Sequence, residues 1–308
     1  MDPRPPSGVL VIDKPRGPTS HDVVGRVRRA LGTREVGHAG TLDPMATGVL
    51  LVAVGEATKL VPWLTAHDKA YEATIALGVE TDTLDAEGRE TRRVPLDARL
   101  VEALAESRGP TIAPKLRAAL EQERSRSEQV PPAFSAIQQG GVRAHERARR
   151  GEAVELPPRP VRVHALELLA CSEAPAFLTV RVEVDKGYYV RSLARDLAGA
   201  LDTVGHLTSL RRTRSGCFTL AEALPLDTPA DELAARVEHV SRAAARALPV
   251  ARLTDTGAVD AFHGRRVRAE DLDAPTAGPS AWLDGRGVLV AVGEVVDGVG
   301  RVIRGFRP

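Results

Sequence analysis

The pattern of apolar and polar residues divides the chain into short strands and amphipathic helices. Apolar runs at residues 9–12 and 49–54 have the length and composition of buried strands. Residues 69–77 alternate instead, so Tyr71 and the other odd-numbered apolar side chains of this stretch share one face of a strand. We therefore expect a sheet whose central strands are well covered.

Helical spacing is clearest at residues 20–31 and 189–201. Thr19 and Ser20 offer hydroxyl groups that can cap the first of these helices, and Gly32 stands where that helix should end. Weaker patterns predict the remaining elements. These are helices at 57–66, 115–129, 144–151 and 230–248, strands at 161–171, 177–185 and 206–218, and an extended segment at 131–138.

The two ends of the chain differ from the middle in their residue pattern. From about residue 248, short strands alternate with Gly and Asp turns, as at Leu283-Asp284-Gly285. This pattern predicts a small, separate β-rich domain at residues 249–308. Residues 1–8 are polar and rich in proline, so we expect a loose leader before a main domain at 9–248.

Composition sets broad limits on function. The 308 residues exceed the length of one average domain, and 43% of them are apolar, which allows a sizeable core. The 42 basic and 41 acidic residues nearly cancel, so net charge argues neither for nor against a nucleic-acid partner. Aromatic residues make up only 3%, which disfavours binding by stacking many bases.

The cysteines and histidines indicate the cellular compartment and whether a metal is bound. Cys171 and Cys217 form no CxxC pair, as is usual in a reducing cytoplasm. The N-terminus lacks the pattern of a signal peptide, and the strongest apolar run, 49–54, is too short to cross a bilayer. We therefore expect a cytoplasmic protein without a membrane partner. The eight histidines show no metal-ligand spacing, so we expect no metal.

The segment most informative about chemistry is GHAGTLDPMATG, residues 37–48. Its three glycines allow tight turns and close approach of a ligand. Asp43 lies in this predicted loop, just before the buried strand, where a carboxylate could act as a nucleophile. Asp-Pro is also a common turn dipeptide, so the pattern alone leaves a capping role for Asp43 open.

Five segments, in order, resemble motifs of the TruB family, the tRNA pseudouridine-55 synthases. They are GVLVIDKPRGPTSHDVV (8–24), GHAGTLDPMATG (37–48), KAYEATIALGVETDTLDAEGR (69–89), PPAFSAIQQGGVRAHERARRGE (131–152) and KGYYVRSLARDLAGALDTVGHLTSLRRTRSGCF (186–218). Any one of them is a weak signal, whereas five in the same order are not expected by chance. The resemblance extends over about residues 8–230.

The resemblance implies catalytic roles for three residues. Asp43 matches the family's essential aspartate, Tyr71 the aromatic residue that stacks on the target uracil, and Arg191 the arginine that pairs with the aspartate. An adjacent guanidinium would lower the pKa of the carboxyl group and keep it ionised. From the pattern alone, Tyr71 also fits a core aromatic and Arg191 an incidental arginine on an amphipathic helix.

The resemblance also implies residues that bind the substrate or support the site. Lys14 matches a lysine that supports the catalytic loop, and His38 a residue that contacts the T-loop. Tyr189 and Leu210 match residues that line the nucleotide pocket. Lys14 and His38 also fit a solvated lysine and a turn histidine.

Basic residues near these motifs are candidates for phosphate contacts, although each alone also fits ordinary solvated surface. They are Arg211, Arg212 and Arg214, and Arg143, Arg147, Arg149 and Arg150.

The implied fold is α/β (α+β), the pseudouridine synthase fold with a mixed, largely antiparallel sheet flanked by helices. A small PUA-like β domain would follow it, and the strand patterns are compatible with both. The implied activity is isomerisation of uridine 55 in the T-loop of tRNA, with the base flipped out and no cofactor. The family acts as a monomer. Attack of the carboxylate at C6, attack at C1′ and a glycal route all remain open.

The sequence departs from the family pattern in several places. Gln138 and His145 stand where the family usually has Lys and Tyr, and Asp185 and Tyr188 replace the more common Ser or Thr. Residues 110–127 look inserted, as a polar surface helix or a mobile segment. Two other function classes fit parts of the pattern. A non-catalytic RNA-binding module would not need Asp43, and a phosphate-loop enzyme lacks its glycine pattern here.

Overall fold

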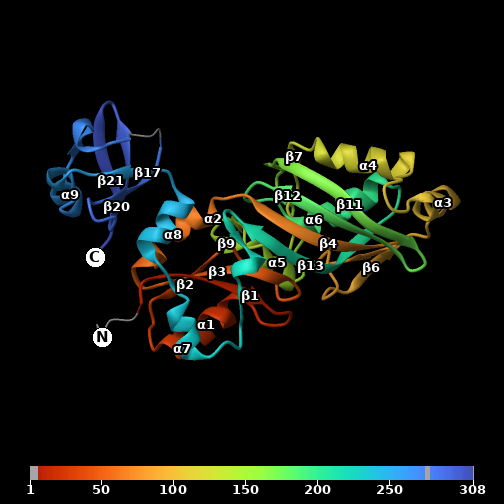
Figure 1. The fold of residues 1–308 in the computed structure, drawn as a ribbon. Helices are drawn as coiled ribbons and strands as arrows, with labels where there is room; N and C mark the ends of the chain where they lie inside the picture. Colours follow the sequence, from red (N-terminus) through yellow and green to blue (C-terminus); the bar gives the residue numbers. More distant parts are fainter. Residues whose placement is uncertain (1–5, 275–277, 308) are drawn as a thin grey trace. The chain divides into compact units, whose positions relative to one another are not determined.

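The computed structural model describes residues 6–274 and 278–307, which form two compact units (Figure 1). Unit 1 comprises Met1–Pro44, Gly48–His67 and Ser215–Pro308, and unit 2 comprises Met45–Thr47 and Asp68–Arg214. The first five residues of the expected leader lie outside the described residues. Ser7 and Gly8 are well anchored, because the Ser7 carbonyl accepts from Val240 N and Gly8 begins the first strand.

The sheet of unit 1 is built around two buried strands. β1 (Gly8–Lys14) pairs antiparallel with β3 (Thr47–Val54), and β3 pairs with β2 (Val36–Ala39). β1 also pairs with β15 (Leu224–Pro225) and β16 (Glu238–His239). The strands predicted at residues 9–12 and 49–54 are therefore confirmed. The predicted loop at 37–48 is wrong at its start, since the backbone from Val36 continues the ladder against β3.

The first helix begins and ends as its sequence predicts. α1 spans Ser20–Leu31, with Thr19 as N-cap in a capping box with Asp22 and Gly32 left-handed at its end (φ 63°). The helix predicted at 57–66 is a 3-10 turn, η1 (Gly55–Leu60), followed by α2 (Val61–Thr65).

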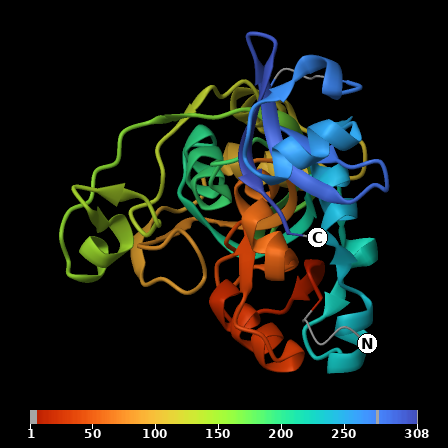
Figure 2. The same cartoon turned by 90° about the vertical axis from the view of Figure 1, so that its left-hand side faces the viewer.

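The helix predicted at 230–248 is interrupted. α7 (Ala230–Ala235) and α8 (Val240–Ala247) are separated by β16, whose Glu238 pairs with Val9. Helical propensity is overridden here because those residues complete the edge of a sheet. α7 packs beside α1 (Figures 1 and 2).

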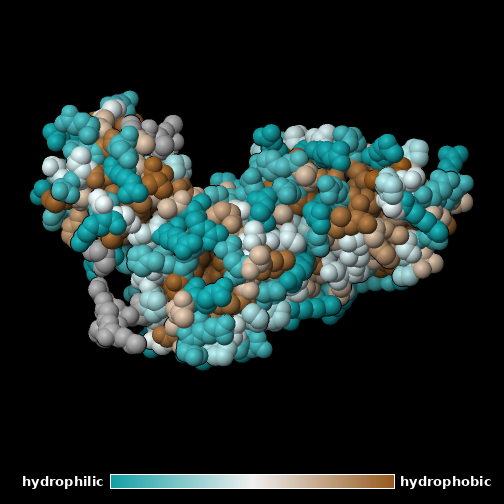
Figure 3. All heavy atoms as spheres, viewed as in Figure 1, coloured by the Kyte–Doolittle hydropathy of each residue, from teal (hydrophilic) through white to brown (hydrophobic). Residues whose placement is uncertain are grey.

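The C-terminal part of unit 1 forms a five-stranded sheet in the order β17-β19-β20-β21-β18. The strands are β17 (Val250–Arg252), β18 (Val267–Arg268), β19 (Ser280–Leu283), β20 (Leu289–Val296) and β21 (Val299–Gly305), with the helix α9 (Asp255–Phe262) against them. Trp282 fills its core, and Gly293 leaves room for the indole. Figure 3 shows hydrophobic side chains among hydrophilic ones on this part.

Unit 2 contains four long strands in the order β11-β12-β4-β13. They are β11 (Val163–Glu173), β12 (Ala176–Val184), β4 (Lys69–Leu77) and β13 (Gly205–Ser215). The helices are α3 (Ala98–Glu106), α4 (Pro114–Arg124), α5 (Ala144–Arg149) and α6 (Val190–Ala200). β11 pairs antiparallel with β12, and β12 with β4, which confirms the expected largely antiparallel α/β architecture.

Three short strand pairs complete unit 2. They are β5 (Val79–Thr81) with β6 (Glu90–Arg93), β7 (Glu128–Gln129) with β10 (Arg159–Pro160), and β8 (Gln138–Gln139) with β9 (Val142–Arg143). Among residues 6–274 and 278–307, no helix is long and apolar enough to cross a membrane.

The helix α4, predicted as a polar surface element or a mobile insertion, is packed into unit 2. Leu116, Leu120 and Glu123 on one side of it are buried, and the helix contacts β11 and α6. Apart from the buried Glu123, the polar residues of the helix lie mainly on its outer face.

Candidate active site

In unit 1, Asp43 stands between two residues whose backbones are tied down. Ser20 Oγ accepts from Leu42 N (2.9 Å) and donates to Leu42 O (3.1 Å), which fixes both polar groups of the residue before Asp43. The carbonyl of Pro44, the residue after it, accepts from Gly17 N (2.9 Å). Asp43 itself is half-buried. A carboxylate held in this way is presented at a fixed position rather than on a loose loop.

Lys14 is the strongest support of this loop. Its side chain is fully buried at the end of β1, and Nζ donates to Pro18 O (2.8 Å), Pro15 O (3.0 Å) and Pro44 O (3.2 Å). An ammonium group has three donors, so these carbonyls can use all of them. The geometry gives Lys14 a loop-holding position, and because the side chain is buried it is not presented to a ligand at the surface.

His38 lies in β2, opposite Val52 of β3, and is half-buried. Its strand neighbours Gly37 and Ala39 pair with the same buried strand, so the position of the imidazole is set by the sheet. Unit 1 therefore contains three of the predicted site residues, Lys14, His38 and Asp43. The other six lie in unit 2.

Tyr71 lies on β4, where it pairs with Val182 of β12 and is 7% exposed. The odd-numbered residues of β4 are buried, as the alternation predicts, so the backbone around Tyr71 is rigid. Its use as a stacking surface for uracil stays a prediction.

Arg191, on the first turn of α6, is held by backbone carbonyls of distant segments. Nη1 donates to Thr83 O (3.0 Å) and Nη2 donates to Phe134 O (2.8 Å), and the residue is 7% exposed. Nε lies 3.8 Å from Asp85 Oδ2. Asp85 accepts in turn from Thr83 Oγ1 (2.7 Å) and Glu87 N (3.0 Å). The guanidinium orientation is thus set from three sides.

Asp85 was missed as a site residue, although it belongs to the TDTLDAEG turn. The TDTLDAEG sequence predicts the Asx-type hydrogen bonds within that turn. The sequence does not predict that this turn packs against Arg191, which lies more than a hundred residues further along the chain.

The residues leading into α6 contact the last turn of α4. Tyr188 Oη donates to Glu123 Oε1 (2.7 Å), and Arg126 Nε donates to Glu123 Oε2 (2.6 Å). Burial raises the pKa of the Glu123 carboxyl group, and the hydrogen bonds from Tyr188 and Arg126 partly oppose this. The pKa of the Tyr188 phenol is also raised, first by burial and then by Glu123. Glu123 was another residue that sequence reasoning missed.

Tyr189, the N-cap residue of α6, is half-buried and is held by Gln129. The predicted pocket residue Leu210 lies on β13, and its carbonyl is 3.4 Å from the Thr47 hydroxyl group, which donates to it. Arg211 Nη1 donates to the same Thr47 hydroxyl group (3.3 Å). Unit 2 thus brings Leu210 and Arg211 next to the short segment Met45–Thr47 of the GHAGTLDPMATG motif.

Two buried cations lie close to one another in unit 2. Lys69 begins β4 and is 7% exposed, and Arg212 of β13 is 1% exposed. Burial lowers the pKa of Lys69 to about 8, with a further contribution from Arg212, while Asp68 acts in the opposite direction. Sequence reasoning missed Lys69. It also treated Arg212 as an exposed phosphate contact, whereas its side chain is enclosed.

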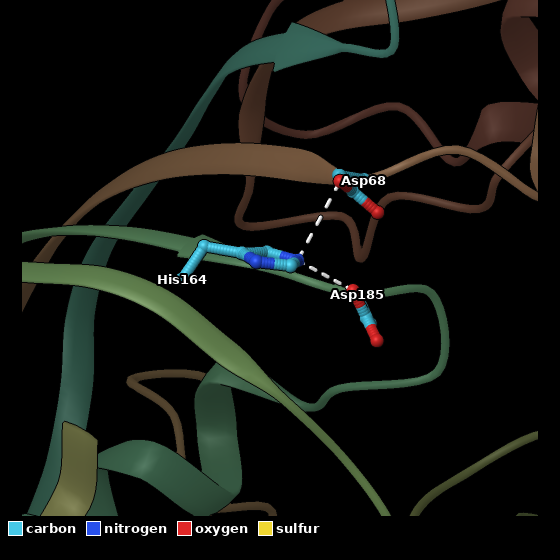
Figure 4. A group of neighbouring side chains, drawn as sticks. All are labelled: Asp68, His164 and Asp185. Atoms are coloured by element: carbon cyan, nitrogen blue, oxygen red, sulfur yellow. Dashed lines mark hydrogen bonds and ion pairs between the residues drawn. The ribbon is translucent and has the colours of Figure 1, made fainter. Parts of the chain in front are cut away.

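Among the described residues, Asp68, His164 and Asp185 form a group that could hold a metal ion (Figure 4). His164 Nε2 lies 2.5 Å from Asp185 Oδ1 and 3.5 Å from Asp68 Oδ2. The imidazole therefore already bridges both carboxylates, and it joins the start of β11 to residues next to β4 and β12. All three side chains are at least 31% exposed.

The basic residues predicted to contact phosphate differ in their surroundings. Arg143, Arg149 and Arg150 are exposed on and beside α5, which projects from unit 2 (Figure 2). Arg147 is bound to Glu152 (2.7 Å), and Arg214 to Glu183 (2.9 Å).

Comparison with known proteins identifies the family. Residues 28–190 match the N-terminal domain of the TruB family of pseudouridylate synthases, and residues 191–249 match the tRNA pseudouridylate synthase B C-terminal domain. The chain is similar to tRNA pseudouridine synthase B of Mycobacterium sp. (strain KMS), with 47% identity over 273 residues and 86% of each chain covered. With tRNA pseudouridine synthase B of Thermobifida fusca (strain YX) the identity is 46%, over 87% of this chain and 89% of the relative.

A solved structure agrees at the level of the fold. A chain of a Cbf5-Nop10-Gar1 complex superposes with a TM-score of 0.71 over 98% of this chain and 84% of the other, at 24% identity. The two family models meet at the start of α6 and together extend over most of the chain. The chain therefore belongs to the TruB family of pseudouridylate synthases, isomerases that act on uridine in tRNA.

Proposed function

We propose that this enzyme converts uridine 55 in the T-loop of tRNA to pseudouridine, with Asp43 as the catalytic carboxylate. The observation that carries the proposal is the fixation of Asp43. Its neighbours Leu42 and Pro44 are tied to Ser20 and Lys14 through their backbones, within a motif that matches the family's catalytic segment. A carboxylate that reacts with a nucleoside needs this degree of positioning.

The proposal assigns distinct roles to the other two catalytic residues. Tyr71 stacks on the uracil, and its rigid strand keeps the phenol in place. Arg191 is the partner of the carboxylate in this proposal, and its guanidinium is oriented by Thr83 O and Phe134 O. The N-glycosidic bond breaks, the uracil rotates, and C5 of the base bonds to C1′ of the same ribose, after which C5 loses its proton and N1 gains one. Attack at C6, attack at C1′ and glycal formation all start from the ionised carboxylate.

The proposed partner is the T-arm stem-loop, bound by a monomer in the cytoplasm. A folded loop is recognised by its shape and backbone, and the target base must leave its stack to reach Asp43. The exposed arginines around α5 supply positive charge for the phosphates. His38, Tyr189, Leu210 and Arg211 are proposed to contact the nucleotides. Buried Lys14 and Arg212 are proposed to support the loop and strand that carry those contacts.

The proposed domain division is a catalytic domain at 9–248 and a PUA-like domain at 249–308. The five-stranded sheet formed by β17 to β21 supports this assignment.

The test is nucleotide mapping of pseudouridine in a T-arm hairpin after incubation with the purified protein, without added metal. The wild type is expected to modify one uridine, at the position equivalent to 55. Asp43→Asn should bind the hairpin with unchanged affinity and form no product. Asp227→Asn, at an exposed position of unit 1, is the matched control and should retain full activity. Product formation by Asp43→Asn would refute the assignment of the nucleophile.

A further inference from the structure

The first turn of α6 is held by the extended segment that follows α4, and one side chain of that segment makes an unusual contact. The carboxamide of Gln129 accepts from Tyr189 N (2.9 Å) and donates to Tyr189 O (3.2 Å). Both polar backbone groups of one residue are therefore satisfied by one side chain, as a strand partner would satisfy them. Gln129 is 2% exposed, so water does not compete for these bonds.

The residue held in this way begins the helix that carries Arg191. Tyr189 is the N-cap of α6, makes no side-chain cap bond, and its carbonyl accepts the first helical bond from Leu193 N (3.1 Å). Arg191 follows two residues later. The direction of the first turn, and with it the origin of the Arg191 side chain, depends on where the Tyr189 peptide groups point.

Neighbouring residues of the same segment reinforce this turn. Val130 O accepts from Ser192 Oγ (2.9 Å) and from Arg195 Nη2 (2.9 Å). Phe134 O accepts from Arg191 Nη2 (2.8 Å). The segment from 129 to 134 therefore fixes both the backbone at the start of α6 and the guanidinium of Arg191, and Gln129 is the side chain of this segment that binds the Tyr189 backbone.

We infer that Gln129 is a positioning residue for the isomerisation, which acts by holding the Tyr189 backbone and thereby the position of Arg191. This inference rests on the proposed function of Arg191 as the partner of the catalytic carboxylate. Gln129 needs no contact with RNA for this role. Its loss displaces Arg191 while leaving the guanidinium and the RNA-binding arginines chemically intact.

The experiment is single-turnover pseudouridine formation in a T-arm hairpin with saturating enzyme, for the wild type, Gln129→Met and the control Gln122→Met. Met is close to Gln in shape but makes neither bond, and Gln122 is an exposed glutamine on α4. We expect the rate constant of Gln129→Met to fall on the order of 10- to 100-fold, since small displacements of reacting groups have effects of this size. Its hairpin Kd should stay within about threefold, because a change confined to the transition state leaves ground-state binding intact.

This design separates positioning from loss of folding. Under saturating enzyme, partial unfolding reduces the active concentration but leaves the rate constant of the folded enzyme unchanged. If Gln129→Met does not fold, Gln129→Asn carries the test, because its carboxamide is chemically the same but one methylene group too short to reach both Tyr189 N and Tyr189 O. A smaller loss is expected for it. A wild-type rate constant in a folded Gln129 variant overturns the inference.

A double-mutant cycle with Arg191→Lys tests whether Gln129 acts through Arg191. If it does, Gln129→Met should reduce the rate much less in the Arg191→Lys background than in the wild type. Fully additive losses overturn the inference. If the wild type itself forms no pseudouridine in the hairpin, the proposed function fails instead, and the two failures are therefore distinguishable.

Discussion

Ser20 Oγ makes two hydrogen bonds to the backbone of Leu42, one as acceptor from the amide and one as donor to the carbonyl. The sequence offers both Thr19 and Ser20 as helix caps, and Thr19 has that role, which leaves the Ser20 hydroxyl group for the loop. The start of α1 thus fixes the residue immediately before Asp43. The same helix start therefore organises both its own first turn and the loop that carries Asp43.

Removal of this contact should reduce both the stability of the fold and the rate of catalysis. Ser20→Ala leaves two buried backbone groups of Leu42 without their partner, so we expect a loss of about 1–3 kcal/mol in the free energy of unfolding. The single-turnover rate constant should fall about 10-fold, because Asp43 is no longer fixed. Urea unfolding and rate measurements test this. Ser125→Ala, which removes an exposed hydroxyl–carbonyl bond at the end of α4, is the control and should change neither quantity appreciably.

Replacement of Lys14 should be among the most destabilising single changes in unit 1. Lys14→Met keeps the bulk of the side chain but leaves three carbonyls without the ammonium group that binds them. We expect the free energy of unfolding to fall by about 3 kcal/mol or more. Lys115→Met is the matched control, because Lys115 binds only exposed Asp97 and Asp202 and should contribute less than about 1 kcal/mol. Equal losses for the two variants would contradict the assignment.

Glu123 predicts a defined pH dependence of stability. Burial raises the pKa of its carboxyl group in the folded protein above the ordinary value of 4.5. The folded state then binds this proton more tightly than the unfolded state. The favourable contribution is fully present below pH 4.5 and is lost as the pH rises through the folded pKa. The stability of the wild type relative to Glu123→Gln should therefore decrease across this interval and then level off. An increase would show that the hydrogen bonds from Tyr188 and Arg126 outweigh burial.

The lowered pKa of Lys69 predicts a change in the stability of the protein at higher pH. Its pKa is lowered from 10.5 to about 8 in the folded protein, so the folded state releases this proton first. The contribution of Lys69 to the free energy of unfolding should be most unfavourable below pH 8, and this penalty should disappear as the pH rises from about 8 to 10.5. The full recovery is on the order of 3 kcal/mol, at 1.36 kcal/mol per pKa unit.

Urea unfolding at pH 7 and pH 9.5 tests this effect of Lys69. Relative to Lys69→Met, the wild type should gain stability between the two values. If the difference in free energy of unfolding between the wild type and Lys69→Met is the same at both pH values, the pKa of Lys69 is not lowered.

The sequence predicts those parts of the structure that are encoded locally. The alternation in β4 and the capping of α1 by Thr19 and Gly32 are confirmed, because periodicity and cap chemistry act over a few residues. The break between α7 and α8 is not visible in an alanine-rich stretch, since it depends on the pairing of Glu238 with Val9. The role of α4 is hidden in the same way, because its buried side faces partners far along the chain.

The candidate site shows the same limit. Asp43, Tyr71 and Arg191 are identified through motif order, and their catalytic roles stay predictions. Gln129 is invisible in its sequence context, where it is one polar residue before Val-Pro-Pro. Its significance comes from the backbone it meets, 60 residues away. Side chains that bind distant main-chain groups leave no periodic or compositional trace.

The helix α8 makes the end of the chain inseparable from its beginning. One side of α8 packs on β1, and it also packs on β19 and β20. Apolar residues from Val9 to Phe306 accordingly belong to a single cluster. A chain cut after Leu248 would expose the alanines of α8 to water and so favour aggregation of the remainder. Loss of activity in such a truncated protein would report a damaged core, and RNA recognition by the last sixty residues is better probed by substitutions on their exposed surface.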